Sequence, residues 1–271
     1  MADQALTYGR YLKVPELLSL QQAHSAPPHH DEALFIIIHQ VYELWFKLLL
    51  HEVDSAVRLL EAERVTEATR LLRRVAEVQR VLIAQVKVLE TMRPQDFLGF
   101  RYHLNPASGF QSVQFRELEF ALGLKDRAML AHLRCEPDEQ ARLEQRLAAP
   151  SLSDAFDQVL QRRGFPTTPS APPEPDGRSR EQEWRLSALA AVYGEPEAHA
   201  DLGALAEVLV DIDELLSLWR AHHVQMVERM IGAKRGTGGS DGVGYLRSTQ
   251  QKRAFPDLWR VRTHIGREPE P

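Results

Sequence analysis

Cysteine is almost absent from this sequence, which holds a single one, Cys135, among 271 residues. No intrachain disulfide can form, and a reducing compartment suits such a chain. Residues 1–18 lack a basic segment followed by an apolar one, so we expect no signal peptide. The apolar runs fall short of the ~20 residues that a membrane span needs, because His39, Glu43 and Lys47 interrupt the longest. We therefore expect a cytoplasmic protein with no membrane partner.

An excess of positive charge is also missing. Lys and Arg number 33 against 38 Asp and Glu, which gives a net charge of −5 and a pI of about 6.1. A nucleic-acid-binding protein would be expected to show a basic face, so we expect no nucleic-acid partner. With 44% hydrophobic and 26% charged residues, the composition is ordinary for a globular protein. The length permits one large domain or two modest ones, and it is ample for a sizeable core.

Glycine and proline are missing from two long blocks, residues 31–93 and 204–231. Both blocks consist mainly of good helix formers, and signals for β-strands are scarce along the chain. A polar segment at 61–70 divides the first block into two helices, of which the second runs to about residue 93. Apolar residues in the first helix follow the spacing of a buried helical stripe: Leu34, Ile37, Ile38, Val41, Leu44, Trp45 and Leu48. The pattern predicts an all-α single domain of several long helices.

Three segments contain many of the glycines and prolines that the two helical blocks lack. Residues 92–111 predict a loop with a short turn, followed by a helix that Gly123 ends. Residues 164–178 contain five prolines and predict an exposed connector. Residues 232–246 contain six glycines, which let the backbone approach a ligand closely, although a flexible hinge or lid is an equally good explanation.

Histidines within apolar helices are the first candidates for chemistry. His39 and Phe35 are four residues apart and share a helix face, although a histidine in such a stripe is more often a satisfied core residue. His51 is about 120° further round the helix, and we expect it to be structural or partly exposed. His222 and His223 point about 100° apart, and the periodicity cannot decide which of them faces a cavity.

These histidines do not predict a zinc site, because no HExxH, CxxC or third spaced ligand accompanies them. One neutral imidazole could ligate haem iron, whereas a helix with surface histidines is the alternative. Arg101 and Arg116 flank the loop at 103–112, and a guanidinium pairs well with a carboxylate. Side chains of the glycine-rich segment could bind a carboxylate or an ammonium group: Lys234, Arg235, Thr237 and Ser240. Together they describe a possible small-molecule pocket.

Four blocks of the sequence closely resemble the tryptophan 2,3-dioxygenase family. They are LTYGRYL, HHDEALFIIIHQVYELWFK, FLGFRYHLNPASGFQSVQFRELEF and WRAHHVQMVERMIGAKRGTGGSDGVGYL, in that order. The resemblance runs from about Leu6 to about Thr263 and weakens through the proline-rich connector. It implies an enzyme with haem b that uses ferrous iron and O2 to cleave the indole C2–C3 bond of L-tryptophan. The product would be N-formyl-L-kynurenine, in the first step of tryptophan degradation by the kynurenine pathway.

The resemblance also implies roles for individual residues. His223, and not His222, would be the axial ligand of the haem iron, and His39 would be the catalytic histidine beside the indole N–H. Arg101 would pair with the substrate carboxylate, and Thr237 would contact the amino-acid head group. The rest of the implied substrate site is Phe35, Ile36, Ile37, Ile38, Phe97, Leu104, Ser108 and Gly109.

The same resemblance implies a homotetramer. An N-terminal arm, residues 1–30, would complete a neighbouring subunit's site with Tyr8 and Tyr11. Phe97 departs from the family pattern, in which a tyrosine is often found, so a hydroxyl near the substrate would be missing. The glycine-rich segment would cover the site and exclude water.

The chemistry of the substrate agrees with these roles. Indole is apolar with one N–H donor, which requires a hydrophobic pocket with one acceptor, and a neutral His39 among isoleucines meets that demand. The residues alone do not decide whether His39 removes the indole proton or only orients the ring. Alternatives are an indoleamine 2,3-dioxygenase-like enzyme with broader substrates, a haem-binding or tryptophan-sensing module without turnover, and a purely structural helical bundle.

Overall fold

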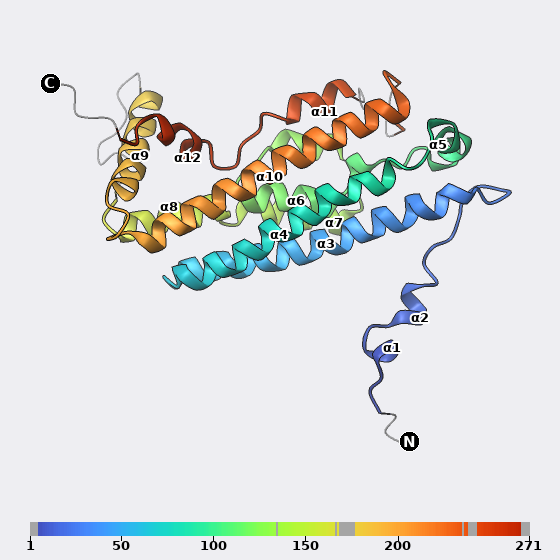
Figure 1. The fold of residues 1–271 in the computed structure, drawn as a ribbon, viewed down its shortest axis with the longest axis horizontal. Helices are drawn as coiled ribbons and strands as arrows, with labels where there is room; N and C mark the ends of the chain where they lie inside the picture. The colour runs from blue at the N-terminus through green and yellow to red at the C-terminus, as the bar shows by residue number, and fades with distance from the viewer. Residues whose placement is uncertain are drawn as a thin grey trace.

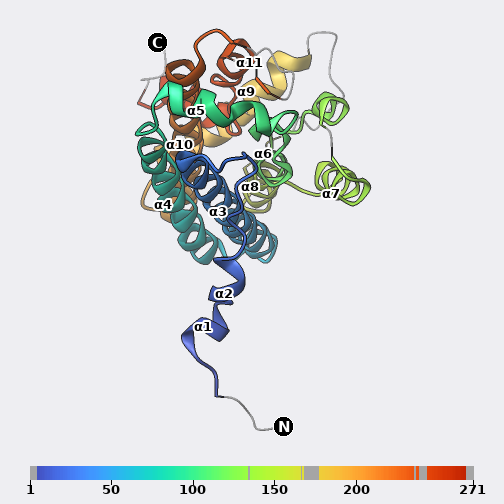
Figure 2. The same cartoon turned by 90° about the vertical axis from the view of Figure 1, so that its right-hand side faces the viewer.

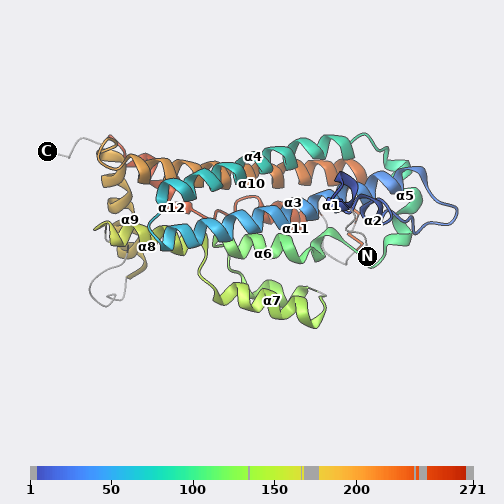
Figure 3. The same cartoon turned by 90° about the horizontal axis from the view of Figure 1, so that it is seen from below.

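Three long helices form the body of the protein in a computed structural model: α3 (His30–Glu61), α4 (Val65–Leu89) and α10 (Ala200–Ile231). The structure describes residues 5–133, 135–165, 167, 177–234, 236–237 and 243–266. Figures 1 and 3 show the three helices running side by side along the long axis. No strand occurs in these described residues, which confirms the all-α prediction.

Shorter helices complete the molecule around this body. α6 (Val113–Leu122) and α8 (Leu152–Arg162) pack against α3, and α7 (Pro137–Ala148) lies outside α6 (Figure 3). The remaining helices of the described residues are α1 (Tyr8–Tyr11), α2 (Val14–Leu17), α5 (Pro94–Arg101), α9 (Gly177–Gly194), α11 (Val243–Thr249) and α12 (Pro256–Arg260), with 3₁₀ turns at Tyr102–Leu104, Gly109–Gln111, Arg127–His132 and Val261–Thr263.

The helix boundaries follow local chemistry. The N-cap residue of α6 is Ser112, whose hydroxyl accepts a hydrogen bond from the Phe115 N–H. The C-cap residue is Gly123, whose φ of +126° suits only glycine well. The break between α3 and α4 is residues 62–64, so most of the polar segment expected to separate them belongs to α4. α4 ends at Leu89, a few residues before the predicted position.

The predicted loop at 92–111 is partly wrong, because it contains the helix α5 and two 3₁₀ turns. Pro94 occupies the first turn of α5, where a missing N–H costs nothing. Gly99 lies inside the helix and leaves room for the His29 ring, since a Cβ at this position would come within 2.8 Å of His29 Nε2. Most of the predicted proline-rich connector, residues 166 and 168–176, lies outside the described residues, and Gly177 already begins α9.

Two apolar clusters lie within the bundle. The larger joins α3, α4, α6, α8 and α10 along the body and includes Leu49, Leu72, Phe156 and Leu209, all almost fully buried. The smaller lies at the end where α3 begins and α4 and α10 end, next to α5 in Figure 1. It contains the buried residues Ile38, Val86, Leu89, Met92, Phe100, Met226 and Met230. We call this smaller cluster the end cluster.

α3 is long and apolar enough, by length and composition alone, to cross a membrane, and no other helix of the described residues is. It packs against α4, α6 and α8, and it contains the buried carboxylates Glu32 and Glu52. A helix in the core of a globular protein can have the same length and composition, and it makes contacts of this kind.

The N-terminal segment containing α1 and α2 leaves the bundle and extends away from it (Figures 1 and 2). Its apolar side chains are exposed, with Tyr8 at 78% and Tyr11 at 71%.

Candidate active site

His39 is on α3 at the edge of the end cluster. Its Nδ1 lies 2.7 Å from the carbonyl oxygen of Phe35, one turn earlier, and its ring packs on the Phe35 ring with centroids 4.1 Å apart. A carbonyl oxygen only accepts, so Nδ1 must carry the proton and Nε2 keeps its lone pair. Burial lowers the pKa of His39, outweighing the opposite effects of the Phe35 carbonyl and Glu43. His39 is therefore a neutral hydrogen-bond acceptor at Nε2.

His223 is on α10, and its neighbour Trp219 packs against the same end cluster as Phe35. Its ring stacks on Trp219, with planes 5° apart and centroids 5.4 Å apart. Burial, together with the positive charge that His39 can acquire, lowers the pKa of His223 to about 4. The two imidazoles are thus close enough to interact electrostatically. Of the two adjacent histidines, both half-buried, His223 is the one whose ring stacks on Trp219 and whose pKa is affected by His39.

Aromatic and aliphatic side chains form an apolar wall beside His39. Phe35 stacks on Phe97 at 5.7 Å, and both rings contact Phe100 edge-on at 5.7 Å and 5.5 Å. Leu104 packs against the same end cluster, and Ile38 is buried in it. Ile36 is half-buried, whereas Ile37 is 46% exposed and turns to the outer face of α3. Consecutive helical residues point about 100° apart, so the three isoleucines cannot all face one pocket of the same chain.

Polar residues from two loops meet near this wall. The hydroxyl of Thr237 donates to the carbonyl oxygen of Ala107 at 2.6 Å, which brings the glycine-rich segment to the loop of Ser108 and Gly109. Ser108 caps the 3₁₀ turn that Gly109 begins. Arg101 ends α5 and is half-buried. Lys234 is exposed, while Arg235, Ser240 and the rest of 238–242 lie outside the described residues, so the proposed lid is described only in part.

Four other residues that the sequence singled out lie away from this wall. The guanidinium of Arg116 is buried and paired with Glu119, so it is a structural group and not a second substrate anchor. His51 is exposed, as expected. Tyr8 and Tyr11 lie on the extended N-terminal segment.

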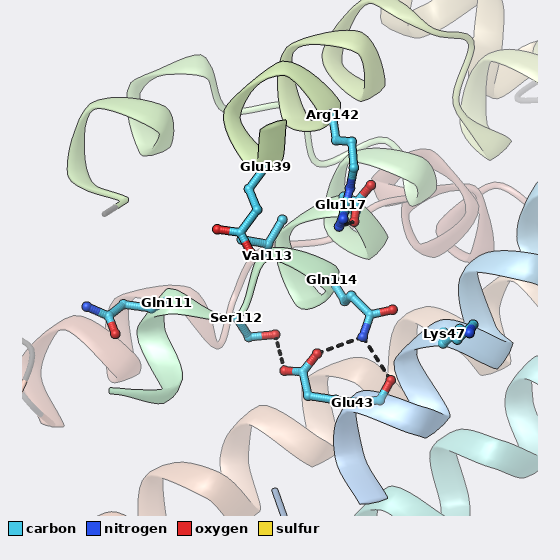
Figure 4. A pocket seen from close by; sticks show the side chains of 9 residues that line it. All are labelled: Glu43, Lys47, Gln111, Ser112, Val113, Gln114, Glu117, Glu139 and Arg142. Carbon is cyan, nitrogen blue, oxygen red and sulfur yellow. Dashed lines mark hydrogen bonds and ion pairs between the residues drawn. The ribbon is translucent and has the colours of Figure 1, made fainter. Parts of the chain in front are cut away.

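Sequence reasoning missed a polar cluster on the far side of Glu43. A cavity of about 670 Å³ opens there between α3, α6 and α7 (Figure 4). Its walls are Glu43, Lys47, Gln111, Ser112, Val113, Gln114, Glu117, Glu139 and Arg142. Neither His39 nor His223 lines it, so it is separate from the apolar wall, although Glu43 is one turn from His39. The only local signal was the spacing of four residues between His39 and Glu43.

The described residues contain no group of three or more His, Cys, Asp or Glu side chains that could hold a metal ion. A haem needs only one protein ligand, because the porphyrin supplies the other nitrogens. His223 suits that role: its imidazole is neutral, and no hydrogen bond joins its ring nitrogens to any other described residue. The adjacent end cluster supplies an apolar surface. The residues present therefore fit a haem.

Comparison with known proteins gives a consistent answer. A family model described as tryptophan 2,3-dioxygenase matches residues 1–162 and 180–265. The tryptophan 2,3-dioxygenase of a Nocardioides species is 50% identical over 265 residues, which cover 96% of this chain and 95% of that protein. Proteins of the same name from Herpetosiphon aurantiacus and Myxococcus xanthus are 48% and 44% identical, and cover 97% of this chain with 100% and 91% of their own lengths.

Proposed function

This chain belongs to the tryptophan 2,3-dioxygenase family, and on that premise we propose how its own residues perform the reaction of that family. The protein is an enzyme that cleaves the indole ring of L-tryptophan with O2, in the kynurenine pathway that this family serves. The family depends on haem. The observation that supports the residue roles best is the pair of neutral imidazoles, His39 and His223, that lie within electrostatic range of each other beside an apolar wall.

His223 would hold haem b with its iron in the ferrous state. Three features support this role: burial keeps the imidazole neutral, no described side chain or backbone group occupies its nitrogens, and Trp219 fixes the plane of its ring. Haem supplies the redox-active iron that activates dioxygen.

His39 orients the indole. Because its Nδ1–H donates to the Phe35 carbonyl oxygen, the lone pair of Nε2 is available to accept a hydrogen bond from the indole N–H. The rings of Phe35, Phe97 and Phe100 exclude water from the apolar part of the substrate. Phe97 contributes only its ring, so this enzyme performs the reaction without a phenolic hydroxyl at that position.

The amino-acid end of tryptophan requires a cation and hydrogen-bonding groups. Arg101 would pair with the carboxylate from the end of α5. Thr237 already donates its hydroxyl proton to Ala107, so its oxygen lone pairs remain free to accept from the substrate ammonium group. Ser108 and Gly109, on the loop that Thr237 contacts, would complete this side of the site.

The protein would work as a homotetramer in the cytoplasm. The exposed tyrosines of the arm at residues 1–30 and the exposed Ile37 and Leu44 of α3 form apolar surface that a second copy can bury. In that arrangement Tyr8 and Tyr11 would reach a neighbour's site. The single cysteine supports a reducing compartment.

A comparison of L-tryptophan with 1-methyl-L-tryptophan tests the role of His39, because the methyl group removes the N–H donor. We expect the parent enzyme to prefer L-tryptophan in kcat/KM, and His39→Ala to reduce that preference by roughly fivefold, since a hydrogen bond between neutral partners contributes about 1 kcal/mol. An unchanged preference in a haem-loaded His39→Ala enzyme would remove His39 from the indole site.

A further inference from the structure

Glu43 is a half-buried carboxylate on α3, one helical turn after His39. Residues four apart on a helix lie on the same face, so Glu43 is placed between the active-site wall and the cavity of Figure 4. None of the substrate-binding or haem-binding roles described above uses it.

Three hydrogen bonds attach the start of α6 to Glu43. The Ser112 hydroxyl donates to one carboxylate oxygen at 2.7 Å, and the Gln114 amide donates to the other at 2.8 Å (Figure 4). The same amide also donates to the backbone carbonyl of Glu43 at 3.0 Å. Ser112 caps α6 at the same time, so its hydroxyl both donates and accepts.

These bonds fix one end of the loop at residues 105–111, which contains Ser108 and Gly109. The loop is largely bonded to itself: the Ser108 N–H donates to the Gln111 side chain at 3.1 Å, and the Gln111 N–H donates to the Ser108 carbonyl at 2.9 Å. At its other side, Ala107 accepts from Thr237. Within the described chain, Glu43 is the side chain of α3 that hydrogen-bonds to the residues closing this loop.

The charge of Glu43 also acts on His39. It raises the pKa of His39 and so opposes the larger effect of burial. The other charged or titratable groups around the two residues are His223 on α10, which faces His39, and four side chains that share the cavity with Glu43: Lys47, Glu117, Glu139 and Arg142. Arg142 is paired with Glu117 at 2.7 Å, so its charge is largely balanced there.

We propose that Glu43 is a positioning residue of this enzyme: by holding Ser112 and Gln114 against α3, it fixes the loop at 105–111 relative to His39. This proposal rests on the function proposed above. A loop displaced by about 1 Å can cost roughly a hundredfold in rate even when no catalytic group is lost, because the reacting atoms must be held in place.

Glu43→Gln is the first test, since it keeps the side-chain shape but removes the charge and replaces one of the two carboxylate acceptors with an amide donor, so that Ser112 and Gln114 cannot both donate to it. The control is Glu117→Gln, which changes a carboxylate in the wall of the same cavity that bonds to Arg142 and not to the loop. In haem-loaded enzyme with an unchanged Soret band, we expect Glu43→Gln to lower kcat by about ten- to a hundredfold and KM to change less than about threefold. The control should keep kcat within about twofold.

The pH profile separates positioning from a merely structural role. Without the negative charge the pKa of His39 falls further, so the acid limb of kcat/KM should move to lower pH in Glu43→Gln and stay in place in the control. Gln114→Ala removes the two hydrogen bonds that Gln114 donates to Glu43 but keeps the charge of Glu43. It should therefore lower kcat without moving the acid limb. The double variant should be no worse than Glu43→Gln alone, because both changes break the same attachment.

Each other outcome overturns the proposal. A kcat within twofold of the parent in haem-loaded Glu43→Gln, or an equal fall in Glu117→Gln, removes Glu43 from the reaction. If Glu43→Gln fails to fold, full activity of Gln114→Ala removes Glu43 from the reaction in its place. Failure of the parent to form N-formylkynurenine is a different result, since it refutes the function itself.

Discussion

Replacing Glu119 by glutamine should destabilise the folded chain by about 3–5 kcal/mol, because it leaves two buried guanidinium groups without a counter-charge. Glu119 is 4% exposed on α6, where one carboxylate oxygen pairs with Arg116 and the other lies 2.5 Å from Arg220 of α10. Arg220 also donates to the carbonyl oxygen of Lys252 at 3.0 Å, so the same cluster ties α6, α10 and the C-terminal segment together. Two positive charges already share one negative charge there, and a glutamine would leave none.

The measurement is thermal unfolding of the apoprotein at one fixed protein concentration, with Glu77→Gln as the control. Glu77 pairs with Arg80 on the exposed face of α4, where a substitution changes stability by less than about 0.5 kcal/mol. A chain of this size loses about 2–4 °C in Tm for each kcal/mol, so Glu119→Gln should lower Tm by roughly 10 °C. A fall of less than ~2 °C would refute the reasoning, since it would mean that the two arginines find other partners without cost.

Three further predictions concern the site. His223→Ala should abolish the Soret band after haem addition while His222→Ala largely retains it; equal loss in both would overturn the assignment of the iron ligand. Arg101→Ala should weaken the capture of L-tryptophan by about 2–5 kcal/mol, measured as a rise in Kd by spectral titration, and an unchanged Kd would remove Arg101 from the site. The pKa of His223 lies at about 4 in the folded apoprotein, below its unfolded value of 6.5, so the folded state binds fewer protons. Apoprotein stability should therefore fall by about 3 kcal/mol as pH drops from 6.5 to 4. Because the pKa of His39 is lowered as well, urea denaturation should show a smaller loss of stability in His223→Phe than in the parent over this pH range, and an equal loss in both would contradict the assignment.

The long helices could be predicted from the sequence because they depend on local composition. The blocks free of glycine and proline became α3, α4 and α10, and Gly123 ended α6 as expected. α5 was missed because Pro94 and Gly99 argue against a helix in isolation. Pro94 is harmless at the first turn, and Gly99 leaves room for the His29 side chain, a contact that only the tertiary structure reveals.

The site was less accessible to local reasoning. Periodicity placed His39 in a buried stripe and could not choose between His222 and His223; the resemblance made that choice, and the packing of α3 against α10 brings His39 and His223 together. Glu43 lies 69 positions before Ser112 and 71 positions before Gln114, the two residues that donate to its carboxylate. Glu119 lies 101 positions before Arg220, with which it pairs. No local pattern encodes such contacts.

The central claim is that this chain inserts both atoms of O2 into L-tryptophan at a haem held by one histidine. The most direct measurement adds ¹⁸O2 to reduced, haem-loaded enzyme with L-tryptophan and determines the mass of the product. We predict N-formylkynurenine with both oxygen atoms labelled, formed by the parent and not by His223→Ala. A haem-loaded parent that forms no such product, or a product with only one labelled atom where exchange with water is excluded, would contradict the account.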